Sequence, residues 1–562
     1  MAAREPWNLK SGSAALVKNG KTILSGIDPA GRAEKVVDSI SIRARTLYFC
    51  PSVLFGYGLS RLLSRLEGVS SSAVLCVESD PEMFELSKKN IDPSITDNIK
   101  LHITDVCNAD MLADVVRDKW GARAFRRIEA VRLTGGWQLS PDLYDSLYDS
   151  LRRGIAADWS NALTLTKLGR LYIRNALRNL AGLSRFFPLS DLSFGAANVL
   201  VLGAGPSLDE TLDALLRHFP GMSGSDERPF RIVCVDTCLG ALKERGITPD
   251  LAVILESQHW NLPDFFGCKG WKVKAAADLS CFPASARTLG GAGYLFMTPW
   301  TTLNIFNRLR EKGFLLVIVQ PLGSVGLTAL DIARRISQGC VICAGLDFSF
   351  TADKYHCKGA PGHLSRLNRQ SRFRGILSTE AYNSHSFSAS SKSGIPVYSS
   401  PVMRHYLDIF KQEFQSDPRL YDIEGTGLSL GLKTLTMSEA MSVLRKNDAR
   451  ATGNDKQPEN ERNRFSRGGK NELASFYKEE ISRLVKLRDM LTGGIDADEF
   501  GLSLLVDECD YLWAHFPDYT GGRPSDLSDV SFLKRIRAEI DPMIRLLENS
   551  LKTAEDRQYD QN

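Results

Sequence analysis

Short apolar runs alternate with amphipathic segments along most of the chain. In the N-terminal third, strand-like runs cover 46–54, 73–78 and 99–103, and the segment 59–66 has helical periodicity. A further helix is expected to start near Pro81, which suits the first turn of a helix and has acidic neighbours. Strands that alternate with helices predict a parallel α/β sheet.

A second α/β pattern follows a predicted connecting helix at 161–185. Its predicted strands are 199–203, 231–236, 251–256, 272–276, 293–298, 315–319 and 340–345. The fold class predicted for the chain is therefore α/β, with two tandem Rossmann-like parallel-sheet domains followed by a C-terminal helical bundle.

The C-terminal part has a different composition. Residues 446–472 are polar and charged with almost no large apolar side chains, which predicts a flexible linker. Beyond them the 3.6-residue period returns and predicts helices. The predicted boundaries are 1–185 for the N-terminal domain, 186–445 for the central domain, 446–472 for the linker and 473–562 for the helical domain.

Composition limits the classes of function. The chain has 562 residues, 43% hydrophobic and 24% charged, and a formal net charge of +4, which is too small to indicate nucleic-acid binding. Neither a secretory apolar segment nor a run of about 18 apolar residues is visible, so we expect a cytoplasmic protein without a membrane span. The 11 cysteines are scattered through strand-like segments, as is usual for buried thiols in a reducing compartment.

The stretch VLVLGAGPSLDE (199–210) combines an apolar run, a glycine turn and the start of an amphipathic segment. Glycines after a buried strand let backbone amides approach a phosphate, and the start of the next helix adds favourable partial charge. Gly203, Gly205, Pro206 and Ser207 are therefore candidate ligand-binding residues. The turn matches neither GxGxxG nor the Walker A pattern, so Ser207 as a simple helix cap stays an open alternative.

Acidic residues follow several strands of the same predicted sheet. Asp236 and Thr237 follow one strand, Glu256 ends the next, and Asp347 follows the strand that leads into Gly345. Carboxyl ends of parallel strands meet at one edge of a sheet, where ligands bind. Each of these acids could equally cap a helix.

Two further features belong to the same predicted domain. Ser324, in PLGSVGLTALDIA (321–333), opens a second strand-to-helix junction and a second possible anion site. His356 lies in a long polar segment with His363 and His385, where a histidine could act as a general base or simply be solvated. Basic residues that could attract an anionic donor are Lys354, Lys358, Arg366, Arg369, Arg372 and Arg374.

The N-terminal unit resembles S-adenosylmethionine methyltransferases in layout. FGYG (55–58) follows its first strand, Glu78 ends the second and Asp105 follows the third. Because Gly56 and Gly58 are all that remains of a glycine loop, an architectural or partner-binding role is favoured over methyl transfer.

Several motifs occur in one order along residues 20–440: GIDPAGRAE (26–34), FGYGL (55–59), RNALRNL (174–180), GAGPSLD (203–209), GITPDL (246–251), GSVGLTA (323–329), GLDFS (345–349) and YHCKGA (355–360). In these the chain resembles the motility accessory factor family, the bacterial flagellin glycosyltransferases. The central domain of that family is similar to the 6-hydroxymethylpterin diphosphokinase-like domain and to the family 42 sialyltransferases.

The resemblance implies a CMP-activated nonulosonic acid donor, such as a pseudaminic or legionaminic acid, and a flagellin serine or threonine as acceptor. It implies no required cofactor, since a CMP donor carries a single phosphate. The residues that match in kind and order are Gly203, Gly205, Pro206, Ser207, Ser324, Gly345 and Asp347. The chain departs from the family pattern at Glu256, where aspartate is usual, and at Tyr355-His356, where Thr-His is expected.

The mechanism predicted from this resemblance is an inverting-type glycosyl transfer. The GAGPS turn holds the CMP phosphate, Asp236 and Thr237 orient the nucleotide or the sugar, and Ser324 stabilises the departing phosphate. His356 is the first candidate for the base that activates the acceptor hydroxyl, with Asp347 or Glu256 as alternatives.

Two other functions remain open from the sequence. One is a Mg-ATP-dependent pterin pyrophosphokinase that uses Asp236, Glu256 and Asp347 as a magnesium site. The other is a non-catalytic accessory protein that binds flagellin through the C-terminal helices.

Overall fold

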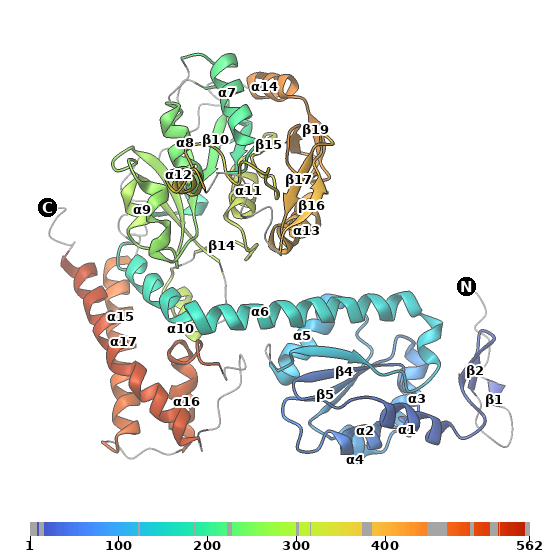
Figure 1. Ribbon diagram of the computed structural model, residues 1–562. Coiled ribbons are helices and arrows are strands. Elements are labelled where there is room, and N and C mark those ends of the chain that lie inside the picture. The colour runs from blue at the N-terminus through green and yellow to red at the C-terminus, as the bar shows by residue number, and fades with distance from the viewer. Residues whose placement is uncertain are drawn as a thin grey trace. The chain divides into compact units, whose positions relative to one another are not determined.

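The computed structural model describes residues 8–9, 16–121, 124–183, 186–221, 228–298, 303–314, 316–373, 385–446, 469–494, 499–517, 527 and 529–556. The chain divides into two compact units (Figure 1). The first contains residues 1–169 and 513–532, and the second contains 170–512 and 533–562. Each unit is described by itself below.

The first unit contains a four-stranded parallel sheet in the order β6-β5-β4-β7. Its strands are β4 (Thr46–Pro51), β5 (Ala73–Val77), β6 (Leu101–Thr104) and β7 (Arg127–Ala130). The sequence analysis did not predict the short strand β7, Arg-Ile-Glu-Ala, because only one of its residues is strongly apolar. Both faces of the sheet are covered by apolar clusters, which explains the continuous apolar runs of β4 and β5.

Helices join these strands as the alternating pattern predicts. They are α1 (Pro29–Ser39), α2 (Leu59–Arg65), α3 (Pro81–Asn90), α4 (Pro93–Thr96) and α5 (Ala109–Trp120). Helix α3 begins at Pro81 as expected, and the Asp80 carboxylate caps it by accepting from the N–H groups of Glu82 and Met83. A small antiparallel sheet of β1 (Asn8–Leu9), β2 (Leu16–Lys18) and β3 (Lys21–Leu24) precedes them.

The predicted connecting helix at 161–185 is the second half of a much longer helix. Helix α6 runs over Pro141–Leu180, so it starts in the first unit and ends in the second. In the second unit, Tyr477 donates its hydroxyl hydrogen bond to the Leu177 carbonyl at 2.7 Å, and this ties the end of α6 to the C-terminal helices.

The second unit is built on a ten-stranded sheet in the order β14-β13-β12-β11-β10-β9-β15-β18-β19, with β8 also paired to β13. All of its recorded pairings are parallel. The strands are β8 (Phe186–Pro188), β9 (Val199–Leu202), β10 (Arg231–Val235), β11 (Leu251–Ile254), β12 (Val273–Asp278), β13 (Gly290–Met297), β14 (Val317–Ile318), β15 (Val341–Ala344), β18 (Leu420–Ile423) and β19 (Lys433–Leu435).

The seven predicted strands of this sheet are confirmed within a few residues. Strands β8, β18 and β19 were not predicted. They have three or four residues each, and they complete the sheet by pairing with β13, β15 and β18 respectively. The helices that follow the central strands are α7 (Leu208–His218), α8 (Leu239–Glu244), α9 (Ser285–Thr288), α10 (Asn304–Glu311), α11 (Val325–Ile336) and α12 (Pro361–Asn368).

A β-hairpin and two helices complete the central part of the second unit. The hairpin consists of β16 (Phe387–Ser390) and β17 (Pro396–Ser399), which pair antiparallel. Helix α13 (Pro401–Phe414) precedes β18, and helix α14 (Met437–Lys446) follows β19.

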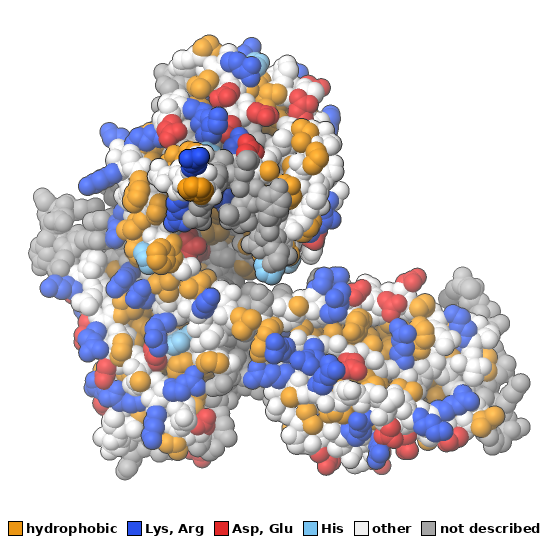
Figure 2. Space-filling view, in the orientation of Figure 1, with side chains coloured by type: hydrophobic (Ala, Val, Ile, Leu, Met, Phe, Trp, Pro, Cys, Tyr) orange, Lys and Arg blue, Asp and Glu red, His pale blue; other side chains and the backbone are white. Residues whose placement is uncertain are grey.

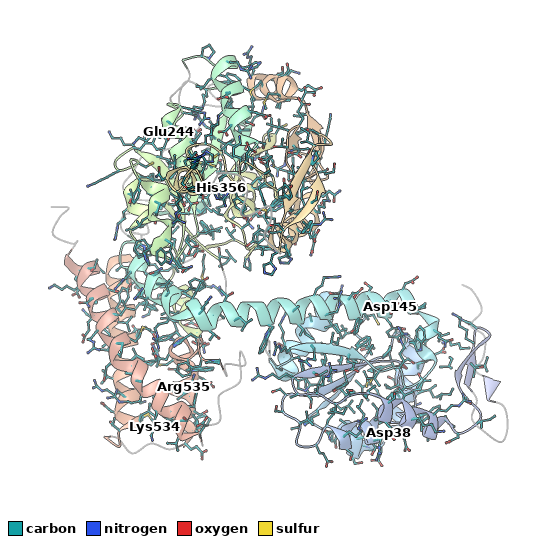
Figure 3. The ribbon with its side chains drawn as sticks, in the orientation of Figure 1. Asp38, Asp145, Glu244, His356, Lys534 and Arg535 are labelled. Carbon is teal, nitrogen blue, oxygen red and sulfur yellow. The ribbon has the colours of Figure 1, made fainter. Side chains whose placement is uncertain are left out.

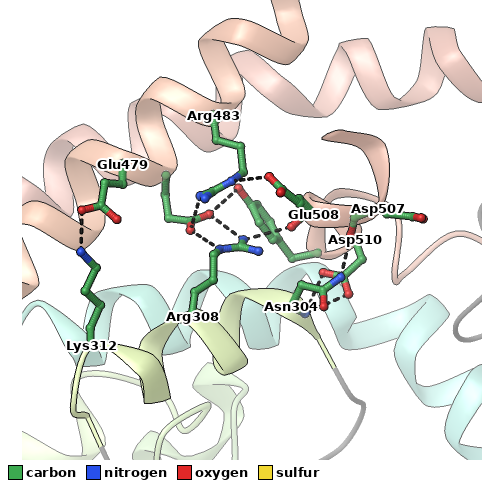
Figure 4. Close-up of polar contacts among 10 residues, drawn as sticks. Asn304, Arg308, Lys312, Glu479, Arg483, Asp507, Glu508 and Asp510 are labelled. Atoms are coloured by element: carbon green, nitrogen blue, oxygen red, sulfur yellow. Dashed lines mark hydrogen bonds and ion pairs between the residues drawn. The ribbon is translucent and has the colours of Figure 1, made fainter. Parts of the chain in front are cut away.

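Helices follow residue 469, as the periodicity predicts: α15 (Gly469–Leu491), α16 (Glu499–Glu508) and α17 (Val530–Asp556). A buried polar network joins α10 to α15 (Figure 4). Glu480, 1% exposed, accepts two hydrogen bonds from Arg308 at 2.6 and 2.9 Å and one from Arg483 at 2.7 Å. Because a buried charge needs charged partners, this network anchors the C-terminal helices on the central part of the second unit.

The predicted linker at 446–472 falls almost entirely on residues 447–468, outside the described part of the chain, and its flexibility stays a prediction. No helix among the described residues is long and apolar enough to cross a membrane. On the face shown in Figure 2, basic side chains are spread over both units and acidic ones lie among them, in keeping with the small net charge.

Candidate functional site

The candidate site lies where the strand order of the large sheet changes direction. From β9 the chain continues through β10 and β11 on one side, and β15 then returns to pair with the other side of β9. In open parallel sheets, ligands bind at the carboxyl ends of the strands beside such a switch point. The residues that follow β9 and β15 therefore define this candidate site.

The turn after β9 is bound closely to the end of β15. The N–H groups of Gly203 and Gly205 donate to the carbonyls of Ala344 and Gly345 at 2.8 Å each. A side chain on Gly205 would place its Cβ 2.4 Å from the nearer Asp347 carboxylate oxygen, and one on Gly203 would come within 2.5 Å of the Gly345 carbonyl. The glycines of GAGPS are thus explained by the close approach of two loops.

The side chain of Asp347, which follows β15, reaches the N-terminus of helix α7. Its carboxylate accepts from the Ser207 N–H at 2.8 Å and from the Ser207 hydroxyl at 2.5 Å. Asp347 is 4% exposed, and burial raises the pKa of its carboxyl, while the Ser207 hydrogen bonds and the nearby Lys392 and Lys354 oppose that rise. Ser207 therefore donates to a carboxylate from another strand, and its side chain makes no cap hydrogen bond of its own.

The turn before helix α11 differs from the turn after β9 in its hydrogen bonding. Gly323 has a φ of +74° and is exposed, and Ser324, at the N-cap position, makes no side-chain cap hydrogen bond. Among the described residues, the N–H groups of Ser324, Val325 and Gly326 have no recorded acceptor. A Cβ on Gly326 would lie 2.7 Å from Leu346, so this helix start also adjoins the end of β15. Helix α11 thus presents free amides to an anion at the switch point.

Asp236 and Thr237 lie together at the end of β10, as predicted. Asp236 is 3% exposed and accepts from the Asn261 amide at 2.8 Å and the Thr237 N–H at 2.9 Å. Burial raises the pKa of Asp236 to about 6, and nearby Glu256 contributes to the rise. Glu256 itself is exposed and accepts from the Gln258 N–H at 2.9 Å.

The structure adds Asp264, which the sequence analysis missed. It lies in the 3-10 helix η6 (His259–Phe265), and burial together with Asp236 and Glu256 raises its pKa to about 7. It does not directly follow a strand, so strand-end reasoning had no means to find it. Asp264 is a carboxyl group able to take up a proton near neutral pH.

His356 lies in the segment between β15 and α12, near α12 in the central domain (Figure 3). It is half-buried, and its ring centroid lies 4.8 Å from that of Tyr355. Burial, together with the nearby Arg366 and His363, lowers the pKa of His356 to about 4. The imidazole is therefore neutral near pH 7 and can accept a proton.

Hydrogen bonds join the segment that carries His356 to the turn that follows β9. The Cys357 N–H donates to the Ala204 carbonyl at 3.0 Å, and Lys354 donates to the Pro206 carbonyl at 3.3 Å and to Asp209 at 2.8 Å. Lys354 is thus held in an ion pair instead of being available to an anionic donor. Arg366 lies over the Tyr355 ring at 4.7 Å, His363 is 9% exposed, and Arg374 lies outside the described residues.

The carboxylates proposed for magnesium are not assembled into a metal site. Asp347 belongs to the end of β15, and β9 separates that strand from β10 and its Asp236. Within the part of the chain that the structure describes, no three His, Cys, Asp or Glu side chains are grouped so that they could hold a metal ion.

Comparison with known proteins identifies the central region. Residues 173–353 match a family described as 6-hydroxymethylpterin diphosphokinase MptE-like. These residues form an MptE-like domain. The match includes both glycine turns and Asp347, and ends three residues before His356.

The MptE-like domain lies within a longer chain that has counterparts over nearly its full length. An uncharacterized protein of Treponema pallidum (strain Nichols) is 26% identical over 530 residues, 92% of this chain and 90% of its own. The MAf glycosyltransferase structure from Magnetospirillum magneticum AMB-1 matches with a TM-score of 0.56 at 13% identity, over 99% of this chain and 93% of that one. The expected motility accessory factor fold with an MptE-like central domain is confirmed.

The RNALRNL motif at the start of the MptE-like domain supports the site from helix α6. The Asn175 amide donates to the carbonyls of Ser257 and Ser280 at 2.8 and 3.0 Å. The Asn179 amide donates to the carbonyls of Leu279 and Cys281 at 2.9 Å each. Both asparagines therefore fix the loops that follow β11 and β12, next to Glu256.

Proposed function

We propose that this protein is a glycosyltransferase that moves a sugar from a nucleotide-activated donor to a protein hydroxyl. The observation that carries the proposal is the open first turn of α11 at the switch point, which offers free amides to a donor phosphate. The shared fold with a protein described as a MAf glycosyltransferase supports the same reaction class. The finer proposal is a CMP-activated nonulosonic acid as donor and a flagellin serine or threonine as acceptor.

The donor phosphate is placed at α11 and not at α7. The amides of Gly203, Gly205 and Ser207 already donate to β15 and to Asp347, and the Asp347 carboxylate would repel a second anion. The amides of the first α11 turn and the Ser324 hydroxyl can stabilise negative charge as the leaving phosphate departs. Asp236 and Thr237, at the end of β10, orient hydroxyl groups of the donor.

The chemical step is a substitution at the anomeric carbon. The acceptor oxygen forms the new glycosidic bond, the bond from the anomeric carbon to the phosphate oxygen breaks, and CMP leaves. The acceptor proton goes to a base. His356, which is unprotonated near pH 7, remains the first candidate from the sequence motif. Asp264, whose pKa of about 7 suits a general base, joins Asp347 and Glu256 as an alternative.

Calorimetric titration with CMP, with and without Mg²⁺, tests the donor site. We expect metal-independent binding that Ser324→Trp abolishes, because the indole would cover the first α11 turn. Ser190→Trp, at an exposed serine in η3 (Leu189–Asp191), is the matched control and should bind CMP as wild type does. ATP binding that requires Mg²⁺, without CMP binding, would favour the pyrophosphokinase instead.

Turnover of the His356→Ala variant tests the base. A positioned base contributes about 10²- to 10⁴-fold to rate, so we expect a loss in that range with CMP affinity unchanged. The Asp264→Asn variant, measured beside it, shows which of the two groups accepts the proton. Full turnover in the His356→Ala variant would remove His356 from the mechanism.

A further inference from the structure

We propose that the first unit contains a docking surface for a bilayer that carries anionic phospholipids. This surface, the amino-edge patch, lies at the end of the small sheet where its strands begin, opposite to the carboxyl ends that bind ligands in open parallel sheets. It consists of Arg43, Arg45, Arg126, Arg127, Ile99 and Leu163. The proposal is separate from the proposed glycosyl transfer and does not depend on it.

The segments that lead into the parallel strands bring the patch together. Arg45 directly precedes β4 and Arg126 directly precedes β7, and the two strands are neighbours. The N–H groups of Arg126 and Arg127 donate to the Arg45 carbonyl at 2.8 and 3.3 Å, which fixes the backbone of these residues. Ile99, 79% exposed, lies just before β6 of the same sheet. In Figure 2 basic side chains gather at this end of the first unit.

Two of the arginines share one aromatic ring. The guanidinium groups of Arg45 and Arg126 each lie 5.3 Å from the ring centroid of Trp159 in helix α6. Leu163 follows one turn later on the same face of that helix and is 59% exposed. The ring attracts both cations and so offsets part of their mutual repulsion. The two guanidinium groups are therefore held in place before any partner binds.

The four arginines of the patch have no carboxylate partner among the described residues. Three of them are exposed, and Arg45 is half-buried. Elsewhere in the first unit, Arg61 pairs with Asp38 at 3.0 Å and Arg132 pairs with Asp145 at 3.4 Å. Unpaired like charges repel one another in the free protein, and a surface that carries many negative charges would relieve that repulsion.

The combination of unpaired arginines with exposed apolar side chains favours a phospholipid surface. Guanidinium groups bind phosphate oxygens two at a time, and a bilayer with anionic lipids presents its phosphates in one plane. Ile99 and Leu163 can enter the boundary between headgroups and acyl chains, where Trp side chains are also favoured. An acidic polypeptide could pair with the arginines, but a segment rich in carboxylates offers little apolar surface to Ile99 and Leu163.

Co-sedimentation of the full-length protein with vesicles tests the proposal. We expect binding to vesicles of phosphatidylcholine mixed with phosphatidylglycerol, little binding to phosphatidylcholine alone, and weaker binding at higher salt. Arg43→Ala combined with Arg127→Ala leaves both Trp159 contacts in place. It should weaken binding at least about tenfold, since each basic residue near an anionic surface contributes about fivefold. The matched control, Arg61→Ala combined with Arg132→Ala, removes the same charge from the same unit and should bind nearly as wild type does.

Ile99→Ser separates a bilayer from an acidic polypeptide, because it keeps the charge and removes the apolar side chain. It should weaken vesicle binding several-fold, whereas Met111→Ser, at an exposed methionine of α5, should not. Thermal unfolding establishes that each variant is folded. The proposal is overturned if the wild type binds both kinds of vesicle alike, or neither. It is equally overturned if the double arginine variant of the patch binds as wild type does, or if Ile99→Ser has no effect, which would leave an acidic polypeptide as the partner.

Discussion

The two glycine turns of the MptE-like domain have the same local form and different roles. In each, glycine and serine precede a helix beside the end of β15, the first at α7 and the second at α11. At α7 the serine donates to the buried Asp347 carboxylate, whereas at α11 the serine and the first amides remain free among the described residues. A glycine turn therefore predicts where backbone amides gather, but not whether a ligand or the protein itself uses them.

The difference comes from what each turn meets in space. Asp347 is 140 residues from Ser207 and reaches it only because β15 pairs with β9. The Leu346 side chain adjoins both turns, at Gly203 and at Gly326, and the α11 turn also meets the Tyr406 ring at Gly323. The first turn is closed by a carboxylate, and the second is lined by groups that leave the amides unpaired.

Of the variants that test the difference between the two turns, replacement of Asp347 should change stability most. The Asp347→Ala variant leaves the Ser207 N–H and hydroxyl buried without an acceptor, so we expect a loss of about 3 kcal/mol in the free energy of unfolding. Urea denaturation measures it. The control is Asp353→Ala, at an exposed aspartate six residues further on, which should change stability little. An Asp347→Ala variant as stable as wild type would show that the first turn does not depend on its carboxylate.

Stability as a function of pH extends the comparison to Asp236, at the neighbouring strand end. Its folded pKa of about 6 lies above the ordinary aspartate value of about 3.9, so the folded state binds more protons between these two values. Stability should therefore fall as pH rises through this range, by up to about 2.7 kcal/mol for two pKa units. The Asp236→Asn variant should lack that component. Equal pH profiles for the two proteins would contradict the raised pKa.

Alanine variants of the two serines should give the smallest effects, but they should separate the roles of the two turns most clearly. Ser207→Ala removes one buried hydrogen bond and should lower stability by about 1 kcal/mol with CMP affinity unchanged. Ser324→Ala should keep stability and weaken CMP binding several-fold, because one donor to the phosphate is lost. Thermal unfolding and calorimetry on the same samples measure both quantities. If Ser207→Ala weakens CMP binding and Ser324→Ala does not, the roles of the two turns are reversed.

Much of the fold could be predicted from the sequence because continuous apolar runs between turn signals are typical of buried strands. Buried strands such as Val199–Leu202 and Arg231–Val235 are followed directly by turn or helix signals, so their type and order are local properties. The missed strand Leu420–Ile423 is no shorter, but its tyrosine and aspartate interrupt the apolar run, and pairing with β15 makes it a strand. Asp264 was missed for a related reason, since its pKa is raised by burial and by the nearby Asp236 and Glu256, and the fold decides both.

The sequence by itself determined the alternation of strands and helices and the family resemblance. It also determined that Gly203, Ser207, Asp236, Ser324 and Asp347 lie in the connections that follow strands. These are properties of neighbouring residues and their spacing. Only the tertiary structure decided that Asp347 closes the α7 turn and that the α11 turn stays open. Hydrogen bonding and desolvation depend on which distant groups share a place in the fold, and strand order sets that.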